Sequence, residues 1–165
     1  MTDALNALVR LAITGVYTKD MDLADPKDTL SKTIEQAFTY GTGSGQANIL
    51  FHDQRQLADA ASEDLDLYGS LANAFGTTLN FAKVKALIIK NLSSTQTLSV
   101  GGAAATQFSN WVANVNDIVV LPPGSFLCLV NPAGYAVTSI LDLLKIANSA
   151  GAVCDYEIII IGNTA

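Results

Sequence analysis

Short runs of β-branched, aliphatic and aromatic residues dominate the chain after about residue 28. Gly, Asn, Ser and Pro interrupt these runs every eight to twelve residues or so, a spacing that is typical of a β-sandwich or β-barrel. The pattern therefore predicts an all-β domain over residues 29–165. The expected strands cover residues 29–40, 47–57, 62–67, 77–81, 83–91, 97–100, 117–121, 125–130, 143–147 and 152–161.

Residues 1–28 are predicted to form an N-terminal element of their own, either a short helix or an extended arm. Asp3 is a candidate helix cap, and Gly15 is a candidate helix end. Residues 20–26 contain three aspartates and a proline, which is typical of a solvated turn. Helix and arm both stay open, although several apolar residues follow helical spacing: Leu5, Leu8, Val9 and Ala12.

Strict alternation in residues 62–67 predicts a strand with one wet face. Leu65 and Leu67 share one face, and Asp64 and Asp66 share the other. This period of two is typical of a half-buried antiparallel strand.

Two other strands become apolar on both faces. Residues 83–91 begin with Lys83 and Lys85 on a common face but continue as Leu87-Ile88-Ile89, and residues 158–161 are a run of four isoleucines. A strand that is apolar on both faces needs a second covering layer from a loop, a helix or a neighbouring subunit. Of these three, we favour a neighbouring subunit.

Phe108 and Trp111 lie close together after a Gly/Ala-rich loop. They could plug one end of the sandwich, or they could anchor a contact between subunits, since aromatic side chains dominate both cores and interfaces. Together with the two-sided strands they give the candidate subunit-contact residues, which are Leu87, Ile89, Phe108, Trp111, Ile159 and Ile161.

Charge is distributed unevenly along the chain. Residues 1–66 carry eleven acids and five bases, which is the whole net charge of −6, whereas residues 67–165 carry only four of each. An ordinary soluble domain carries about a quarter of its residues as charged side chains, so the surface of the second segment is expected to consist of neutral Ser, Thr, Asn and Gly or to be covered by another protein. The second alternative suggests a component of an assembly. The acidic balance argues against nucleic acid as a partner.

No catalytic, cofactor or metal pattern emerges from the sequence. His52 is the only histidine, and no G-x-S-x-G motif places a nucleophile. The glycines of residues 41–45 lack the spacing and the helix of a phosphate-binding loop. Cys128 and Cys154 lie in apolar runs without a Cys/His cluster, so we expect two buried reduced thiols rather than a zinc site.

The N-terminus shows no basic segment followed by an apolar core, and no apolar run reaches the length that spans a bilayer. We therefore expect synthesis in the cytoplasm without a signal peptide, and no membrane partner.

Several strand and turn segments after residue 61 are distinctive when taken together. The two longest are Ser62–Gly76 (SEDLDLYGSLANAFG) and Leu79–Asn91 (LNFAKVKALIIKN). They are followed by Val100-Gly-Gly, VLPPGS at 120–125, GYAV at 134–137 and DLLKIAN at 142–148. In these segments the chain resembles small virion proteins of tailed bacteriophages, whereas residues 1–32 take no part in the resemblance. These are strand and turn patterns, so no functional residue is carried over.

The resemblance implies a jelly-roll-like antiparallel β-sandwich and a non-enzymatic structural role. Within that family, the best match is a capsid cement or decoration protein that binds the capsid surface as a homotrimer, with the major capsid protein as its partner and no cofactor. The alternatives are a tail, baseplate or receptor-binding component, and a carbohydrate-binding β-sandwich module. An enzyme is the least favoured class.

Overall fold

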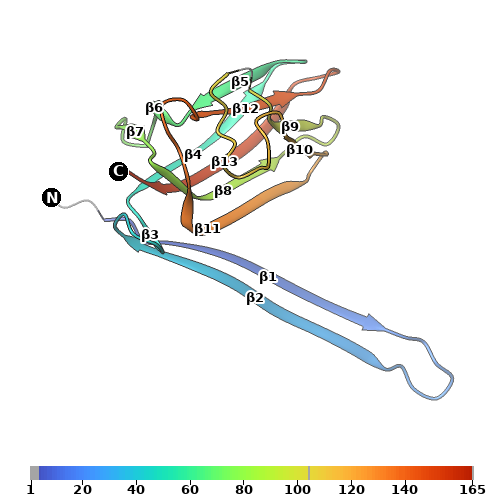
Figure 1. Ribbon diagram of the computed structural model, residues 1–165. Coiled ribbons are helices and arrows are strands. Elements are labelled where there is room, and N and C mark those ends of the chain that lie inside the picture. Colours follow the sequence, from blue (N-terminus) through green and yellow to red (C-terminus); the bar gives the residue numbers. More distant parts are fainter. Residues whose placement is uncertain (1–3, 104, 165) are drawn as a thin grey trace.

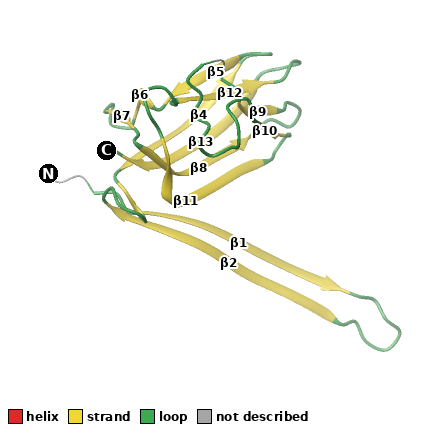
Figure 2. Ribbon diagram, in the orientation of Figure 1, coloured by secondary structure: helices red, strands yellow, loops and turns green. Residues whose placement is uncertain are grey.

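The computed structural model describes residues 4–103 and 105–164. Within these residues the chain consists of strands, turns and loops with no helix, which confirms the predicted all-β class (Figure 2). A body of packed strands and one long projecting hairpin are the main features (Figure 1).

Eight strands of the body pair in a nested order. Counted along the chain, the first pairs with the eighth, the second with the seventh, the third with the sixth and the fourth with the fifth, all antiparallel. The eight strands are β4 (Ile49–Leu57), β5 (Ser62–Asp66), β8 (Lys83–Asn91), β9 (Leu98–Gly101), β10 (Ile118–Leu121), β11 (Phe126–Ala136), β12 (Leu143–Asn148) and β13 (Cys154–Asn163).

Two further pairings join these strands into two sheets. Strand β13 also pairs with β8, which gives the order β11-β8-β13-β4, called the β13 sheet below. Strand β12 also pairs with β9, which gives the order β10-β9-β12-β5, called the β12 sheet. The two sheets enclose one core, so the body is a β-sandwich.

The core lies between the sheets because one face of each strand is apolar. On β13 the inward residues Tyr156, Ile158 and Ile160 are fully buried, and on β12 so are Leu144 and Ile146. Removing such a side chain from water contributes about 1.5–3 kcal/mol each, which is the main force that holds the sheets together.

The projecting hairpin, called the arm, is made of β1 (Ala7–Thr18) and β2 (Lys27–Tyr40). Its strands pair without interruption from Ala7 opposite Phe38 to Thr18 opposite Lys27. Of the two alternatives for the N-terminal element, the extended arm is thus correct and the helix is wrong. Val9, Ile13 and the other β-branched residues of β1 disfavour a helix and suit a paired strand.

The arm continues beyond the N-terminal element that the sequence predicted. The strand expected at residues 29–40 is present, but it pairs with β1 instead of joining the sandwich. Residues 19–26 connect the two strands as an exposed turn, as predicted. The arm then ends near β3 (Gln46–Ala47), which pairs in parallel with the last residues of β2.

Other strand predictions agree with the structure to within a few residues. The chain also forms β6 (Tyr68–Ala72), which the sequence did not predict, paired with β7 (Thr78–Asn80), and β11 runs on to Ala136. The predicted wet face of residues 62–67 is confirmed, since Leu65 and Leu67 are buried and Asp64 is exposed.

The cysteine prediction is half right. Cys154 is buried, but Cys128 is exposed, because it lies on the outer face of the edge strand β11. Both are free thiols, and burial raises the pKa of the Cys154 thiol above its ordinary value.

Candidate interaction surface

The arm has one apolar face and one polar face. Residues that are opposite in the register point to the same side of the ribbon, and successive residues point to opposite sides. Leu11 therefore shares a face with Ile34, whereas Arg10 shares the other face with Glu35. The large apolar residues on the first face are Val9, Leu11, Ile13, Tyr17, Leu30, Ile34 and Phe38, and this is called the apolar face of the arm.

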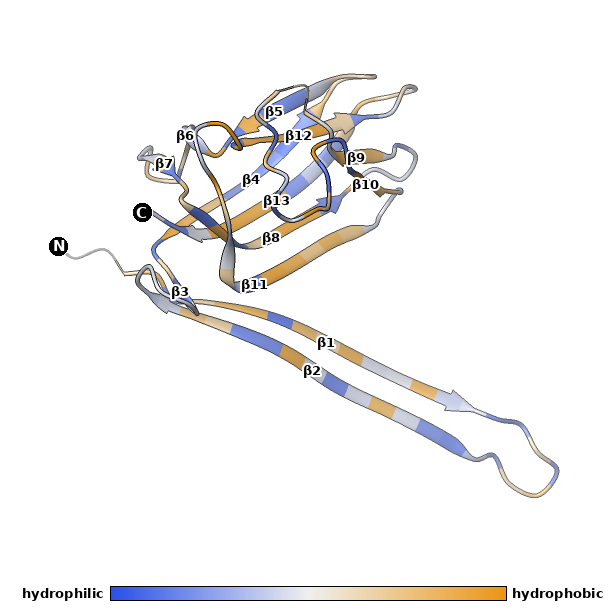
Figure 3. Cartoon of the chain, in the orientation of Figure 1, coloured by the Kyte–Doolittle hydropathy of each residue, from blue (hydrophilic) through white to orange (hydrophobic). Residues whose placement is uncertain are grey.

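The opposite face of the arm is mainly polar. It carries the Arg10–Glu35 ion pair, in which Nε and Oε1 are 2.6 Å apart, and several threonines and serines. Leu8 and Val16 are its large apolar residues. The hydropathy pattern along the two strands is visible in Figure 3.

At its base the apolar face packs against the sandwich. Phe38 is 1% exposed and lies in a small cluster with Ala86 of β8 and Ile161 of β13, to which Val9 also packs. These residues lie on the outer face of the β13 sheet, opposite the main core. The covering layer predicted over Ile161 is therefore supplied here by the arm of the same chain and not by a neighbour.

Lys85 fixes the base of the arm to the sheet. Its side chain is 1% exposed, and its Nζ donates to three carbonyl oxygens, those of Gly43 (3.0 Å), Pro132 (2.9 Å) and Ala133 (3.1 Å). The alternation of residues 83–91 gave no sign of this buried position. The register shifts at this point of β8 on both sides, so Lys85 lies in a bulge that turns it toward these carbonyls.

The hydrogen bonds of Lys85 join two loops that are distant in sequence. Gly43 lies in the loop that follows the arm, and Pro132 lies where β11 departs from its pairing with β8. Gly134, with a φ of 88°, lets that segment pass close to β8, because an added Cβ would be 2.8 Å from the Lys83 Cβ. Burial lowers the pKa of Lys85.

Beyond the base of the arm, the outer face of the β13 sheet stays apolar in part and only partly covered, with Ile88 half-buried against the cluster under the arm. The next row across the strands is, in order, His52, Ile159, Ile88 and Cys128. The row after it ends in Phe126 on the edge strand β11. Ile159 is 39% exposed and Phe126 is 57% exposed. We call Ile88, Phe126, Cys128 and Ile159 the outer patch.

The outer face of the β12 sheet differs in character. Asp64 of β5 lies opposite Lys145 of β12, and Ser62 and Ser99 flank Ala147. Exposed apolar side chains occur at the edge strand β10, at Ile118 and Val120. Apart from this edge strand, the apolar part of the outer faces lies on the β13 sheet. One portion of it is covered by the arm, and the outer patch is the portion that stays exposed.

The predicted subunit-contact residues divide into two groups. Ile159 has accessible surface on the outer patch. Leu87, Ile89 and Phe108 are buried in the main core. Trp111 packs against that core, and its Nε1 donates to the Phe108 carbonyl at 2.9 Å. Ile161 lies under the arm. The aromatic pair therefore fits the core-plug alternative, and of the six residues Ile159 is the one that offers an exposed side chain to a neighbour.

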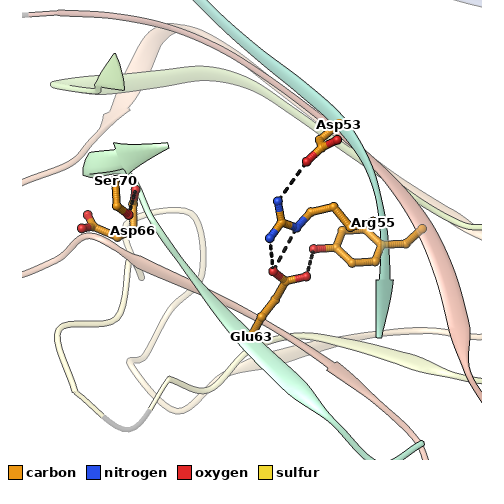
Figure 4. A network of polar contacts seen from close by, with 6 residues as sticks. Asp53, Arg55, Glu63, Asp66 and Ser70 are labelled. Atoms are coloured by element: carbon orange, nitrogen blue, oxygen red, sulfur yellow. Dashed lines mark hydrogen bonds and ion pairs between the residues drawn. The ribbon is translucent and has the colours of Figure 1, made fainter. Parts of the chain in front are cut away.

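A polar network closes the edge of the sandwich between β4 and β5 (Figure 4). The Arg55 Nε donates to Glu63 Oε2 at 2.9 Å, and Arg55 Nη1 donates to Asp53 Oδ2 at 2.9 Å. The Tyr156 hydroxyl donates to Glu63 Oε1 at 2.7 Å. The network thus links residues of β4 and β13 in one sheet to Glu63 of β5 in the other.

The network is poorly suited to acid–base chemistry. Both carboxylate oxygens of Glu63 accept hydrogen bonds, and the bond to Glu63 raises the pKa of Arg55 further. Burial, with the same carboxylate, raises the pKa of Tyr156 well above its ordinary range. The shallow hollow beside the network is lined by further acidic residues such as Asp64 and Asp66. A structural role in joining the two sheets accounts for all of these contacts.

The remaining candidates for chemistry stay apart. His52 is exposed on β4, and within residues 4–103 and 105–164 no three His, Cys, Asp or Glu residues gather in a way that could hold a metal ion. The described part of the chain also contains no helix that could cross a membrane.

No family model, curated protein or solved structure matches the chain.

The apolar face of the arm is the feature that the sequence analysis missed. A signal was present, because Ala7, Val9, Leu11 and Ile13 alternate with a period of two. The helical spacing of Leu5, Leu8 and Ala12 competed with it over the same residues.

Proposed function

We propose that the protein is a non-enzymatic structural protein of a bacteriophage particle, most consistent with a cement or decoration protein on the capsid surface. The observation that carries this proposal is the exposed apolar face of the arm. Ile13 is 42% exposed, Leu30 53% and Ile34 55%, although all three are large aliphatic side chains. A surface of this kind marks a contact with another protein.

The form of the arm supports a role in assembly. A two-stranded hairpin without a supporting layer is marginally stable in water. The arm has such a layer only at its base, where Phe38 is buried, and it projects well away from the body beyond that point (Figure 1). A covering partner would stabilise its outer part.

The sandwich provides a rigid support for the arm. The nested pairing of its eight strands supports its interpretation as a jelly roll, an architecture that is common in viral capsid proteins. Lys85 and Phe38 fasten the arm to one sheet, so that a force on the arm is transmitted to the body. Such a molecule can bridge the joint between two capsid subunits.

A cement protein acts by adding contacts. Each molecule that spans a joint raises the free energy needed to separate the subunits under the pressure of the packaged DNA. In this proposal the partners are the major capsid protein and further copies of the chain, arranged as a homotrimer. No cofactor or catalytic residue is needed for such a role.

Charge along the chain is compatible with this arrangement. The arm is close to neutral, with five acids and four bases in residues 4–40. Much of the negative charge lies on β4, β5 and the turn between them, at Asp53, Asp59, Glu63, Asp64 and Asp66. The acidic edge would face solvent, and the neutral arm would be free of long-range repulsion from other copies.

Two measurements test the proposal. Light scattering coupled to gel filtration should give the mass of a trimer. Sedimentation with undecorated capsids of the phage that encodes the chain should carry the protein into the pellet, and the temperature of capsid disruption should rise. Purified tails of the same phage serve as the control. Binding to tails instead of capsids would contradict the capsid role and favour the tail alternative.

A further inference from the structure

We propose that the apolar face of the arm binds a second copy of this chain, lying on the outer patch of that copy's β13 sheet. This inference rests on the self-association that the proposed function includes, and it specifies the two surfaces. The donor surface is formed by Leu11, Ile13, Leu30 and Ile34. The acceptor surface is formed by Ile88, Phe126, Cys128 and Ile159.

The donor surface is continuous and free of interruption by bulges. The register of β1 and β2 is unbroken, so Leu11 lies beside Ile34, and Ile13 lies diagonally from both Leu30 and Ile34. Lys32 is the charged residue among these pairs, and its long side chain can keep its ammonium group at the rim. The face is therefore a narrow, nearly neutral stripe.

The acceptor surface lies next to a place where the same kind of contact already exists. At the base of the arm, Phe38 and Val9 cover Ala86 and Ile161 on the outer face of the β13 sheet. Ile159 and Ile88 form the adjacent row of that face, one step further along the strands. The contact within the chain is thus a template for a contact between chains, with the same donor face on the same acceptor face.

The arm cannot complete this contact on its own body. From Phe38 outward it leaves the sandwich, and the views show its tip far from both sheets (Figures 1 and 3). Consistent with this, Tyr17 near the tip is 72% exposed. The outer patch of the same chain also stays open, with Phe126 57% exposed. Each chain therefore has one unused donor surface and one unused acceptor surface.

Apolar character favours the β13 sheet over the β12 sheet as the acceptor. On the β12 sheet, one outer row pairs Asp64 with Lys145, and the next row contains Ser62, Ala147 and Ser99. On the β13 sheet, the row of Cys128, Ile88 and Ile159 is apolar, whereas Lys90 and Glu157 share the next row with Phe126. Covering Lys90 and Glu157 without full compensation would be costly, so the arm is expected to lie along the apolar row.

The uncovered part of the arm sets the area of each contact. The eight residue pairs from Leu11–Ile34 to Thr18–Lys27 form a face about 26 Å long and about 10 Å wide. One contact would therefore bury about 530 Å² in total, and a reciprocal pair of contacts between two copies would bury about 1,060 Å², which reaches the area expected of a specific interface. In a ring of three copies, each of the three interfaces would bury about 530 Å², and closure of the ring joins them. Because every chain donates one arm and accepts one, such an assembly closes without free surfaces.

The first test compares two double variants of the full-length protein. Leu11→Ser with Ile34→Ser changes the apolar face, and Leu8→Ser with Val16→Ser makes the same kind of change on the opposite face of the same arm. We expect the first to weaken self-association at least tenfold in sedimentation equilibrium and the second to weaken it less than threefold. Equal effects of the two variants, or no effect of either, would overturn the inference.

A folding control accompanies this comparison. All four residues are exposed or lie outside the sandwich core, so the thermal unfolding of the dissociated chain should be nearly the same in both variants. Circular dichroism of the variants at low concentration checks this. A third variant on the acceptor side, Ile159→Lys, should dissociate the assembly as strongly as the first double variant, because it places a charge in the apolar row of the outer patch.

Cross-linking identifies which surfaces meet. Cys128 is an exposed thiol within the outer patch, whereas Cys154 is buried. Under mild oxidation, Ile34→Cys or Leu30→Cys should give a dimer on a non-reducing gel, with mass spectrometry assigning the bond to Cys128 of another chain. The dimer should be lost when Cys128→Ser is added, and Leu8→Cys is the matched control.

The alternative products are also informative. A bond between two introduced cysteines would show that arms pair with each other and would overturn the assignment of the acceptor. A bond to Cys128 within one chain, or no dimer from either position, would also overturn it.

Failure of this inference can be distinguished from failure of the proposed function. If the Leu11/Ile34 variant keeps its mass and still binds capsids, the arm inference is wrong and the capsid role stands. If the unaltered protein assembles through the arm but binds neither capsids nor tails, the arm inference stands and the virion role is wrong.

Discussion

The arm and strand β13 each have a face lined by large apolar residues, but these faces have opposite surroundings. On β13, Ile158 and Ile160 are completely buried, whereas on the arm Ile13 and Ile34 are 42% and 55% exposed. Strand β13 lies between β4 and β8 and under the opposite sheet. The arm has two strands and a partner layer only at its base.

This difference shows which apolar faces of the molecule are covered within one chain. The sandwich buries the core-facing apolar residues of both sheets within one chain. The outer arm pairs about half of its backbone groups within the hairpin and leaves its apolar side chains in water. In both regions the sequence contains an apolar face that is expected to be covered. Only the structure shows that the face of the outer arm lacks a cover.

The largest expected effect comes from making the same substitution in the two regions. Ile158→Ala should lower the free energy of unfolding by about 2–5 kcal/mol, because it leaves a cavity in a packed core. Ile13→Ala should change it by less than about 0.5 kcal/mol in the dissociated chain, because the side chain is already in water. Urea unfolding at low protein concentration checks both values.

The opposite order of effects would refute the comparison. If Ile13→Ala destabilised the dissociated chain as much as Ile158→Ala, the outer arm would be packed within one chain, and the need for a partner would disappear.

The sequence was sufficient for the parts that depend on local pattern. The alternation at Leu65 and Leu67 correctly predicted a half-buried strand, and the runs around Leu87 and Ile160 correctly predicted strands with little wet surface. These outcomes follow from side-chain periodicity alone. Strand positions and the all-β class were therefore predictable.

Contacts between residues that are distant in sequence were not predictable. Ile161 was expected to be covered, but periodicity carries no information that Phe38 would do so. The buried position of Lys85 was not predicted, because nothing in the local pattern marks the bulge that turns it toward the carbonyls of Gly43 and Pro132. The apolar face of the arm became evident only from the register between β1 and β2.

The next effect in size concerns the attachment of the arm. Lys85→Met keeps an unbranched side chain but removes the donor for the carbonyls of Gly43 and Ala133, which should lower the free energy of unfolding by about 1–3 kcal/mol. Amide exchange should become faster in residues 41–45 and 131–134 and stay unchanged in the centre of β13. Lys83→Met, at an exposed position of the same strand, is the control and should have little effect.

This result would separate the two regions experimentally. Fast exchange spreading through the whole of β13 would show that Lys85 supports the sandwich as much as the arm. The proposed division between a self-sufficient body and an attached arm would then be wrong.

A smaller effect is expected in the polar network that closes the sandwich. Tyr156→Phe removes the hydroxyl that donates to Glu63 and should lower the free energy of unfolding by about 1–2 kcal/mol at neutral pH. The pKa of Tyr156 is raised in the folded state, so folding keeps its proton where the unfolded chain loses it. Its contribution is therefore complete below the ordinary tyrosine pKa of about 10 and decreases as the pH rises above that value.

The variant should consequently show a flatter decline of stability in alkaline solution. Unfolding measured between neutral pH and pH values above the ordinary tyrosine pKa checks the slope, and Tyr17→Phe on the exposed arm is the matched control. An equal slope in the Tyr156→Phe and unaltered proteins would contradict the role of the buried hydroxyl.

The smallest effect should come from the ion pair on the polar face of the arm. The Arg10 and Glu35 side chains are 59% and 43% exposed, so their interaction is screened by solvent, and such pairs contribute about 0.2–1 kcal/mol. The double variant Arg10→Ala with Glu35→Ala should unfold almost like the unaltered protein and should keep its assembled mass. This near-absence of effect is informative, because Arg10 is the direct sequence neighbour of Leu11 but points to the other side of the ribbon. The opposite result would be that removing the ion pair dissociates the assembly in sedimentation equilibrium while Leu11→Ser with Ile34→Ser does not. The polar face would then be the binding face. The contrast between a covered and an uncovered apolar surface would not explain assembly.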